Sequence, residues 1–170
     1  KFVFGFDLKK GIVSPGGVGY DINCGVRILL TNITKLEFMK KREQILSELY
    51  KNVPSGVGTG GEFKFDEKQM NEILIKGSNW ALENDYATEE DIEKTEDNGQ
   101  IKGADFTKAS QKAKARGKNQ LGTLGAGNHF IEVQEIENVY DEKIADIFGL
   151  KKGNIAIMIH TGSRGLGHQI

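Results

Sequence analysis

Short runs of hydrophobic residues predict several strands along the chain. Phenylalanine at every second position predicts a strand over residues 1–7, and a β-branched, apolar run predicts a largely buried strand over residues 24–33. A further strand is expected to begin at residue 129 and to continue to residue 134. A continuous apolar run predicts a buried strand over residues 154–159.

Apolar residues at helical spacing separate these strands. Thr34 and Glu37 have the spacing of a capping box, and Asp66 and Gln69 are placed to cap a second, shorter helix. Helices or helical turns are predicted over residues 35–52, 66–75, 80–86, 88–95, 102–118, 141–150 and from 166 onward.

Glycine-rich loops next to the predicted strands hold the residues that are able to bind a metal ion. Asp21 and Cys24 lie in the loop over residues 14–27, His129 ends a second glycine loop, and His160 stands at the tip of strand 154–159. Carboxylate, thiolate and imidazole are all metal ligands, and a thiolate sulfur is able to bridge two ions. Taken singly, Cys24 also fits a buried structural cysteine, and each histidine fits a hydrogen-bonded core residue. Taken together, the four residues predict a metal site, and ligand softness alone favours Zn²⁺.

Three residues around the second glycine loop are candidates for nucleotide binding. A period of two places Asn128, Phe130 and Glu132 on one face of the strand, away from His129. Asparagine suits a phosphate or ribose, phenylalanine suits the face of a base, and a glutamate accepts the two N–H groups on a guanine edge. Glycines at 56–62 form a loop that resembles a phosphate cradle only loosely, because no Walker Lys-Ser/Thr pair follows.

Charge is unevenly distributed, although the formal net charge of the 170 residues is only −1. Residues 102–118 carry six basic side chains against Asp105 on an expected helix, which fits either a phosphate-facing patch or a solvated surface. Arg164, in the turn after the strand 154–159, is placed to fork onto a phosphate.

Composition fits one domain with its own core. The single cysteine excludes an intrachain disulfide and suits a reducing compartment, so a cytoplasmic location is expected. No apolar run approaches the length of a membrane span, so no membrane partner is expected.

Three long motifs resemble the RtcB RNA-splicing ligases and occur in that family's order: GGVGYDINCGVR at 16–27, LGTLGAGNHFIEV at 121–133 and HTGSRGLGHQ at 160–169. The resemblance spans nearly the whole chain. It implies an incomplete α+β fold, a mixed β-sheet with helices packed around it, in which residues 1–170 form part of the catalytic domain. It also implies an enzyme that joins RNA ends bearing a 2′,3′-cyclic phosphate or 3′-phosphate to 5′-hydroxyl ends, in tRNA splicing or RNA repair, with GTP and two Mn²⁺ ions.

The resemblance also implies roles for individual residues. The family pattern places the guanylylated histidine and a further metal-binding histidine beyond Ile170, and His168 lies in the wrong motif to replace them. The N-terminal part of the family's fold is also expected to be missing. We therefore expect a fragment that binds Mn²⁺ weakly or not at all and is not guanylylated by itself. The implied ligands are Asp21, Cys24 and His129 for one ion and Cys24 and His160 for the other, the nucleotide site is Asn128, Phe130 and Glu132, and the RNA-phosphate contacts are Arg116 and Arg164.

Two other functions are compatible with the same residues. One is a metal-independent hydrolase in which Cys24 is the nucleophile and a histidine is the base. The other is a non-enzymatic RNA- or nucleotide-binding module that uses the basic segment and the glycine loops. For the ligase, Mn²⁺ is favoured over Zn²⁺ because carboxylate and phosphate oxygens around two close cations suit phosphoryl chemistry. The need for an activating protein partner is left open.

Overall fold

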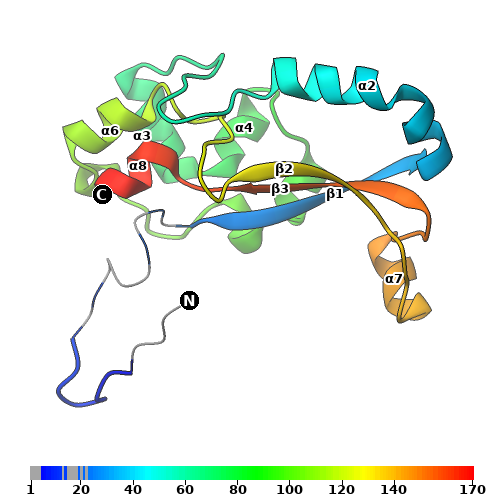
Figure 1. Ribbon diagram of the computed structural model, residues 1–170. Helices are drawn as coiled ribbons and strands as arrows, with labels where there is room; N and C mark the ends of the chain where they lie inside the picture. The colour runs from blue at the N-terminus through cyan, green and yellow to red at the C-terminus, as the bar shows by residue number, and fades with distance from the viewer. Residues whose placement is uncertain (1–4, 13, 15–18, 20, 22) are drawn as a thin grey trace.

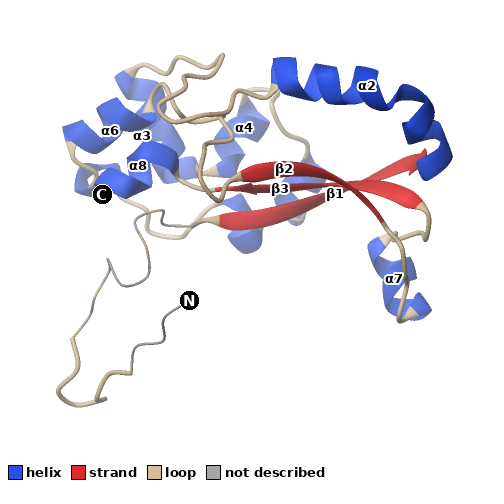
Figure 2. Ribbon diagram, viewed as in Figure 1, coloured by secondary structure: helices blue, strands red, loops and turns tan. Residues whose placement is uncertain are grey.

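The computed structural model describes residues 5–12, 14, 19, 21 and 23–170 of the chain. Within them, three strands form one antiparallel sheet in the order β1 (Gly25–Thr34), β3 (Asn154–Thr161) and β2 (Phe130–Glu135) (Figure 2). The central strand β3 is antiparallel to both of its neighbours. Its C-terminal end therefore lies beside the N-terminal ends of β1 and β2.

Helices gather mainly at that end of the sheet. Figure 1 shows α3, α4, α6 and α8 clustered where β3 ends, whereas α2 and α7 lie toward the other end. The helices are α2 (Lys35–Asn52), α3 (Glu67–Lys76), α4 (Ser78–Glu83), α5 (Glu89–Glu93), α6 (Gln111–Gly117), α7 (Glu142–Phe148) and α8 (Arg164–Gln169), with short 3₁₀ turns η1 (Glu96–Gly99) and η2 (Phe106–Lys108).

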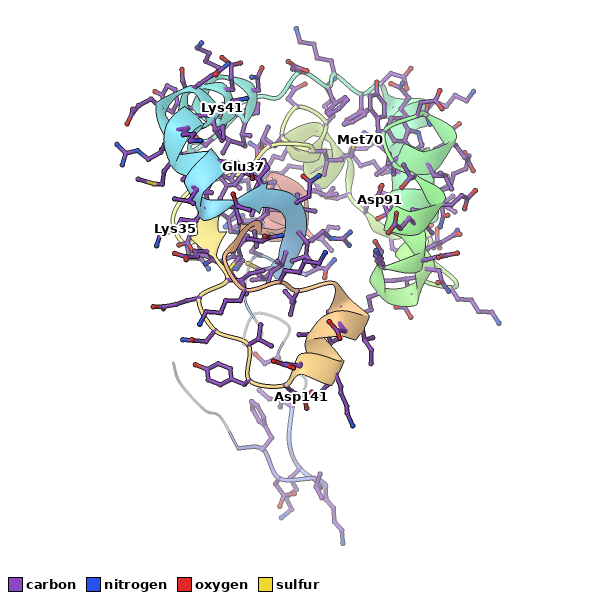
Figure 3. The ribbon with its side chains drawn as sticks, turned by 90° about the vertical axis from the view of Figure 1, so that its right-hand side faces the viewer. Lys35, Glu37, Lys41, Met70, Asp91 and Asp141 are labelled. Atoms are coloured by element: carbon purple, nitrogen blue, oxygen red, sulfur yellow. The ribbon has the colours of Figure 1, made fainter. Side chains whose placement is uncertain are left out.

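Local capping explains where the two predicted capped helices begin. Thr34 and Glu37 form a complete capping box at α2, and Asp66 with Gln69 forms another at α3, as the sequence predicts. Lys35 and Glu37 lie in the first turn of α2 (Figure 3), and Lys35 Nζ lies 2.8 Å from Glu135 Oε2 at the end of β2. This ion pair ties the start of α2 to the end of the sheet that is remote from the clustered helices.

The hydrophobic core lies among the clustered helices, beside the sheet. Phe65, Met70, Trp80, Ala113 and Leu166 form one buried cluster (Met70 is labelled in Figure 3). The rings of Phe65 and Trp80 meet edge to face with centroids 5.3 Å apart. The close packing of α6 on α8 depends on a small residue, because a Cβ at Gly117 would lie 2.9 Å from the Cβ of Leu166. The core thus fixes α8 and the turn that leads into it from β3.

The sheet differs from the sequence prediction in two respects. Strand β1 was expected to be largely buried, yet Val26 and Ile28 are 57% and 51% exposed. Helix α2, which follows this strand, contributes no buried residue to cover it. The expected mixed sheet is instead wholly antiparallel in the described residues, where the one parallel pairing is an isolated bridge between Ser55 and Gly125.

One further predicted strand and one predicted helix also differ from the structure. For the strand expected over residues 1–7, residues 5–7 are not in a strand and residues 1–4 lie outside the described part of the chain. The basic helix expected within 102–118 is interrupted. Asp105 accepts a hydrogen bond from Thr107 N and Ser110 accepts one from Ala113 N, so each side chain starts a separate helical segment.

No helix of the described residues has both the length and the apolar character needed to cross a membrane.

Truncation of the core methionine tests this packing. Met70 is 1% exposed, so Met70→Ala should lower the free energy of unfolding by about 2–5 kcal/mol. The matched control Met39→Ala removes the same atoms from a side chain that is 52% exposed, and should change it by no more than about 0.5 kcal/mol. Urea unfolding followed by the fluorescence of Trp80, the sole tryptophan, measures both. Equal losses in the two variants would contradict the placement of the core.

Candidate metal centre

Sheet topology brings the predicted metal ligands to one place. Cys24 directly precedes β1, His129 directly precedes β2, and His160 is near the C-terminal end of β3. His160 is opposite Val26 on one neighbouring strand and Phe130 on the other. His129 and His160, which follow Cys24 by 105 and 136 positions, therefore meet it at one end of the sheet.

Cys24 lies between the two histidines. Its Sγ is 3.4 Å from Nε2 of His129 and 3.0 Å from Nε2 of His160. Asp21 completes the group, with its Oδ2 2.5 Å from Nε2 of His129. The ligand atoms of Asp21, Cys24 and His129 all lie within 4.8 Å of one another, and His160 joins them through the sulfur. All four residues that the sequence predicts as metal ligands are thus brought together.

The backbone of the second glycine loop decides which nitrogen of His129 faces this group. Gly125 has a φ of 108°, and a Cβ there would lie 2.4 Å from Nδ1 of His129. The Nδ1 side of the His129 ring therefore packs directly against the backbone of Gly125, and only glycine fits at position 125. Nε2 is left to face Asp21 and Cys24, as a ligand nitrogen must.

Buried polar atoms in the group fit a cation. Within the described part of the chain, neither Asp21 Oδ2 nor His129 Nδ1 has a hydrogen-bond partner, although both atoms are buried. Oδ2 is close to His129 Nε2 but is not reached by a hydrogen bond of acceptable geometry. A buried carboxylate oxygen without a donor is costly, and a cation among the Asp21 oxygen, the Cys24 sulfur and the His129 nitrogen would remove that cost.

The electrostatics of Cys24 favour a metal ligand over a free nucleophile. Desolvation of the thiol and the negative charge of Asp21 raise the pKa of Cys24, although the residue is exposed. A catalytic cysteine that works without metal needs the opposite shift, since the thiolate is the nucleophile. A bound cation removes the proton from a coordinating thiol.

Asp21 is ionised in the same surroundings. Partial burial raises its pKa, but hydrogen bonds from Ser163 and the proximity of His129 outweigh that effect, so the net pKa lies below the usual value. Ser163 was not predicted as part of the site. The one sequence feature that could have indicated Ser163 is its place in the turn directly after the strand that carries His160.

Phe130 and Glu132, two of the candidate nucleotide residues, lie on the same side of the sheet as His160. Phe130 is its cross-strand partner, with ring centroids 5.2 Å apart. Glu132 lies two residues further along that face and accepts a hydrogen bond of 2.7 Å from Gln134. Asn128 is exposed at the end of the loop. Because His129 precedes the strand, its ring also reaches His160, with centroids 5.6 Å apart.

Arg116 and Arg164 make defined contacts inside the structure. Nη1 of Arg116 lies 3.1 Å from Nδ1 of His168 and donates to Gln169 Oε1 at 3.0 Å. Arg164 donates through Nε to Thr123 Oγ1 at 3.0 Å and through Nη2 to the carbonyl of Gly56 at 3.2 Å. Arg164 thus holds the glycine loop at 56–62 to the glycine loop that ends at His129. The backbone N–H of Gly56 also donates to the carbonyl of Gly125, which joins the same two loops.

The basic segment is not a continuous charged surface. Lys114 is 7% exposed, and its Nζ lies 4.9 Å from the centroid of the Phe106 ring. Its charge therefore contributes to the packing of α6 against η2 rather than to a phosphate-facing patch.

Cobalt binding tests the site, because Cys24 is the only cysteine and gives a clean thiolate signal. We expect Co²⁺ to produce a sulfur-to-metal charge-transfer band in the ultraviolet. Cys24→Ser should abolish the band, and His129→Ala should weaken binding by about tenfold or more, as loss of one ligand does. His168→Ala is the matched control, since that residue lies outside the group, and it should retain parent affinity. A band that survives Cys24→Ser would contradict thiolate ligation.

Comparisons with known proteins agree with this geometry. The model of the family described as "tRNA-splicing ligase RtcB" matches residues 2–170. Curated proteins of that name are similar to the chain: the one from Thermococcus kodakarensis is 52% identical over 168 residues, and the one from Methanococcus maripaludis is 49% identical over 168 residues. Each match covers 99% of this chain but 35% of the relative, so the chain spans about a third of these relatives' length. Since the family match extends over nearly every residue, including all the metal-ligand candidates, the chain belongs to the RtcB family.

Proposed function

We propose that this chain is the part of a GTP- and Mn²⁺-dependent RNA ligase that supplies most of its metal ligands. The reaction joins an RNA end with a 2′,3′-cyclic phosphate or 3′-phosphate to a 5′-hydroxyl end, through a histidine that is guanylylated and expected beyond Ile170. The observation that carries the proposal is the meeting of Asp21, Cys24, His129 and His160 at one sheet edge. The relatives' name, tRNA-splicing ligase, supports RNA as the substrate.

Each metal ligand has a proposed place. Asp21, Cys24 and His129 hold one ion, and Cys24 and His160 contribute to the other, with the Cys24 sulfur shared. The position of that sulfur between two imidazole nitrogens supports this sharing. Two bound divalent cations neutralise phosphate charge and activate an attacking oxygen. The carboxylate of Asp21 and the RNA phosphates favour Mn²⁺ as the working ion, although softer Zn²⁺ suits the cysteine and histidines.

The face of β2 beside His160 is the proposed guanine nucleotide site. Phe130 flanks the base, Glu132 accepts from the guanine edge, and Asn128 contacts phosphate or ribose. The exposure of Glu132 and its place on the His160 face support this assignment. RNA phosphates are assigned to Arg116, which is exposed on α6, and to Arg164, whose guanidinium bridges the glycine loops beside His129.

A ligation assay with a chelator tests the proposal. The protein used is a natural polypeptide of the relatives' length that contains this segment. Cys24→Ser should abolish joining of a 2′,3′-cyclic phosphate RNA to a 5′-hydroxyl RNA, because the shared ligand of both ions is lost. The control Tyr140→Ser alters a side chain that is 96% exposed in the loop after β2, and should leave joining unchanged.

Each alternative function gives a different result in that assay. Retention of Mn²⁺-dependent joining by Cys24→Ser would refute the two-ion arrangement. Hydrolysis that resists chelators but is lost on alkylation of Cys24 would indicate the cysteine hydrolase. RNA or nucleotide binding that survives loss of Cys24, without any joining by the parent, would indicate a binding module.

Nucleotide selectivity provides a second prediction. Glu132→Gln replaces one acceptor with a donor, so the preference for GTP over ATP should fall by about tenfold or more, as expected for loss of a charge-assisted hydrogen bond worth about 1.5–3 kcal/mol. Glu135→Gln makes the same chemical change on the opposite face of β2 and should keep the preference. Competition between labelled GTP and unlabelled ATP measures both variants. Unchanged discrimination in Glu132→Gln would show that another residue reads the base.

A further inference from the structure

The carboxylate of Asp21 is held by the turn that follows β3. The backbone N–H of Ser163 and its hydroxyl each donate to Oδ1 of Asp21 at 2.9 Å. Both hydrogen bonds reach the same oxygen, so the other oxygen, Oδ2, is left facing His129 Nε2 at 2.5 Å. The two carboxylate oxygens thus have separate tasks, one as an anchor and the other as a ligand.

Close contact with the backbone of the same turn restricts the carboxylate further. A Cβ at Gly162 would lie 2.5 Å from both carboxylate oxygens and 2.7 Å from Cγ of Asp21. The backbone φ of Gly162 is outside the left-handed range, so the space taken by the carboxylate, and not strain, requires glycine here. The turn therefore restricts the Asp21 carboxylate both by hydrogen bonds from Ser163 and by close packing against Gly162.

The Ser163 hydroxyl is available to donate to Asp21 because Gln120, and not Ser163, caps helix α8. It is the N-cap residue of α8, where a serine hydroxyl ordinarily accepts a hydrogen bond from a helix N–H. Ser163 makes no such bond to α8. Instead, Oε1 of Gln120 accepts from the N–H of Gly165 at 3.0 Å. The Ser163 hydroxyl is thereby left to act as a donor toward Asp21.

We propose that Ser163 is a positioning residue of the metal centre, which holds Asp21 so that Oδ2 points toward Cys24 and His129. The inference rests on the proposed metal site and adds to it a residue that does not touch the ion. Since the turn that holds Ser163 directly follows β3, which carries His160, Ser163 also fixes the carboxylate relative to the histidine of the second ion. Groups that orient metal ligands in this way typically contribute 10–100-fold to metal affinity.

Removal of the hydroxyl tests the proposal through metal binding, independently of activity. Ser163→Ala keeps the backbone N–H but loses one of the two anchors, so Co²⁺ affinity, titrated by the Cys24 charge-transfer band, should fall by about tenfold or more. Ser163→Thr retains a hydroxyl and should restore affinity to within about threefold of the parent. Urea unfolding in the presence of a chelator measures separately how much the hydroxyl stabilises the metal-free chain, since it donates to the Asp21 carboxylate there too.

Ser110→Ala is the matched control. Ser110 is also an N-cap serine, and its hydroxyl accepts from the N–H of Ala113 in the ordinary way. Its loss should lower the urea midpoint and leave Co²⁺ affinity unchanged, whereas Ser163→Ala should lower Co²⁺ affinity.

The outcomes separate this inference from the proposed function. Parent affinity in Ser163→Ala, or a loss that Ser163→Thr does not restore, would overturn the positioning role and leave the metal centre standing. A lowered urea midpoint in Ser163→Ala, equal to that in Ser110→Ala and accompanied by parent affinity, would make Ser163 a structural anchor only. A parent polypeptide of the relatives' length without a Cys24-dependent Co²⁺ band would overturn the metal centre and this inference together.

Discussion

The antiparallel pairing of β3 with both β1 and β2 is the constraint on which the candidate metal centre depends. It places the C-terminal end of one strand beside the N-terminal ends of the other two, where His160, Cys24 and His129 stand. A register shift of one residue would carry His160 to the opposite face of the sheet, away from Phe130 and the Cys24 sulfur. The pairing of His160 with Val26 and Phe130 is therefore as much a part of the site as the ligands themselves.

Helix packing fixes the remaining side of the site. Gly117 lets α6 approach Leu166 of α8 closely, and Gln120 caps the N–H of Gly165. These contacts hold the turn between β3 and α8, and with it the donors that bind the Asp21 carboxylate. Arg164, with a φ of 55°, completes this arrangement by joining the loops at Gly56 and Thr123. The core thus supports the site, whereas much of β1 remains exposed.

The charges at the site agree with the proposed role of Cys24 as a metal ligand. The negative charge of Asp21 that raises the pKa of the Cys24 thiol is the same charge that attracts a cation. A hydrolase without metal needs a lowered pKa of its cysteine thiol instead. The carboxylate beside the sulfur therefore works against one alternative chemistry and in favour of the other.

The sequence by itself determined the features that depend on neighbours three or four residues away. The capping boxes at Thr34 and Asp66, and the end of α7 at Gly149, are set by such local hydrogen bonds and by glycine's access to positive φ. The candidate ligands could also be named from the sequence, because carboxylate, thiolate and imidazole groups are able to bind metals wherever they lie. Only the tertiary structure decided that β1 is exposed, that Lys114 is buried, and that Ser163 binds a carboxylate 142 residues away. Those outcomes follow from strand register and helix packing, which join residues whose separation leaves no periodic or local signal in the sequence.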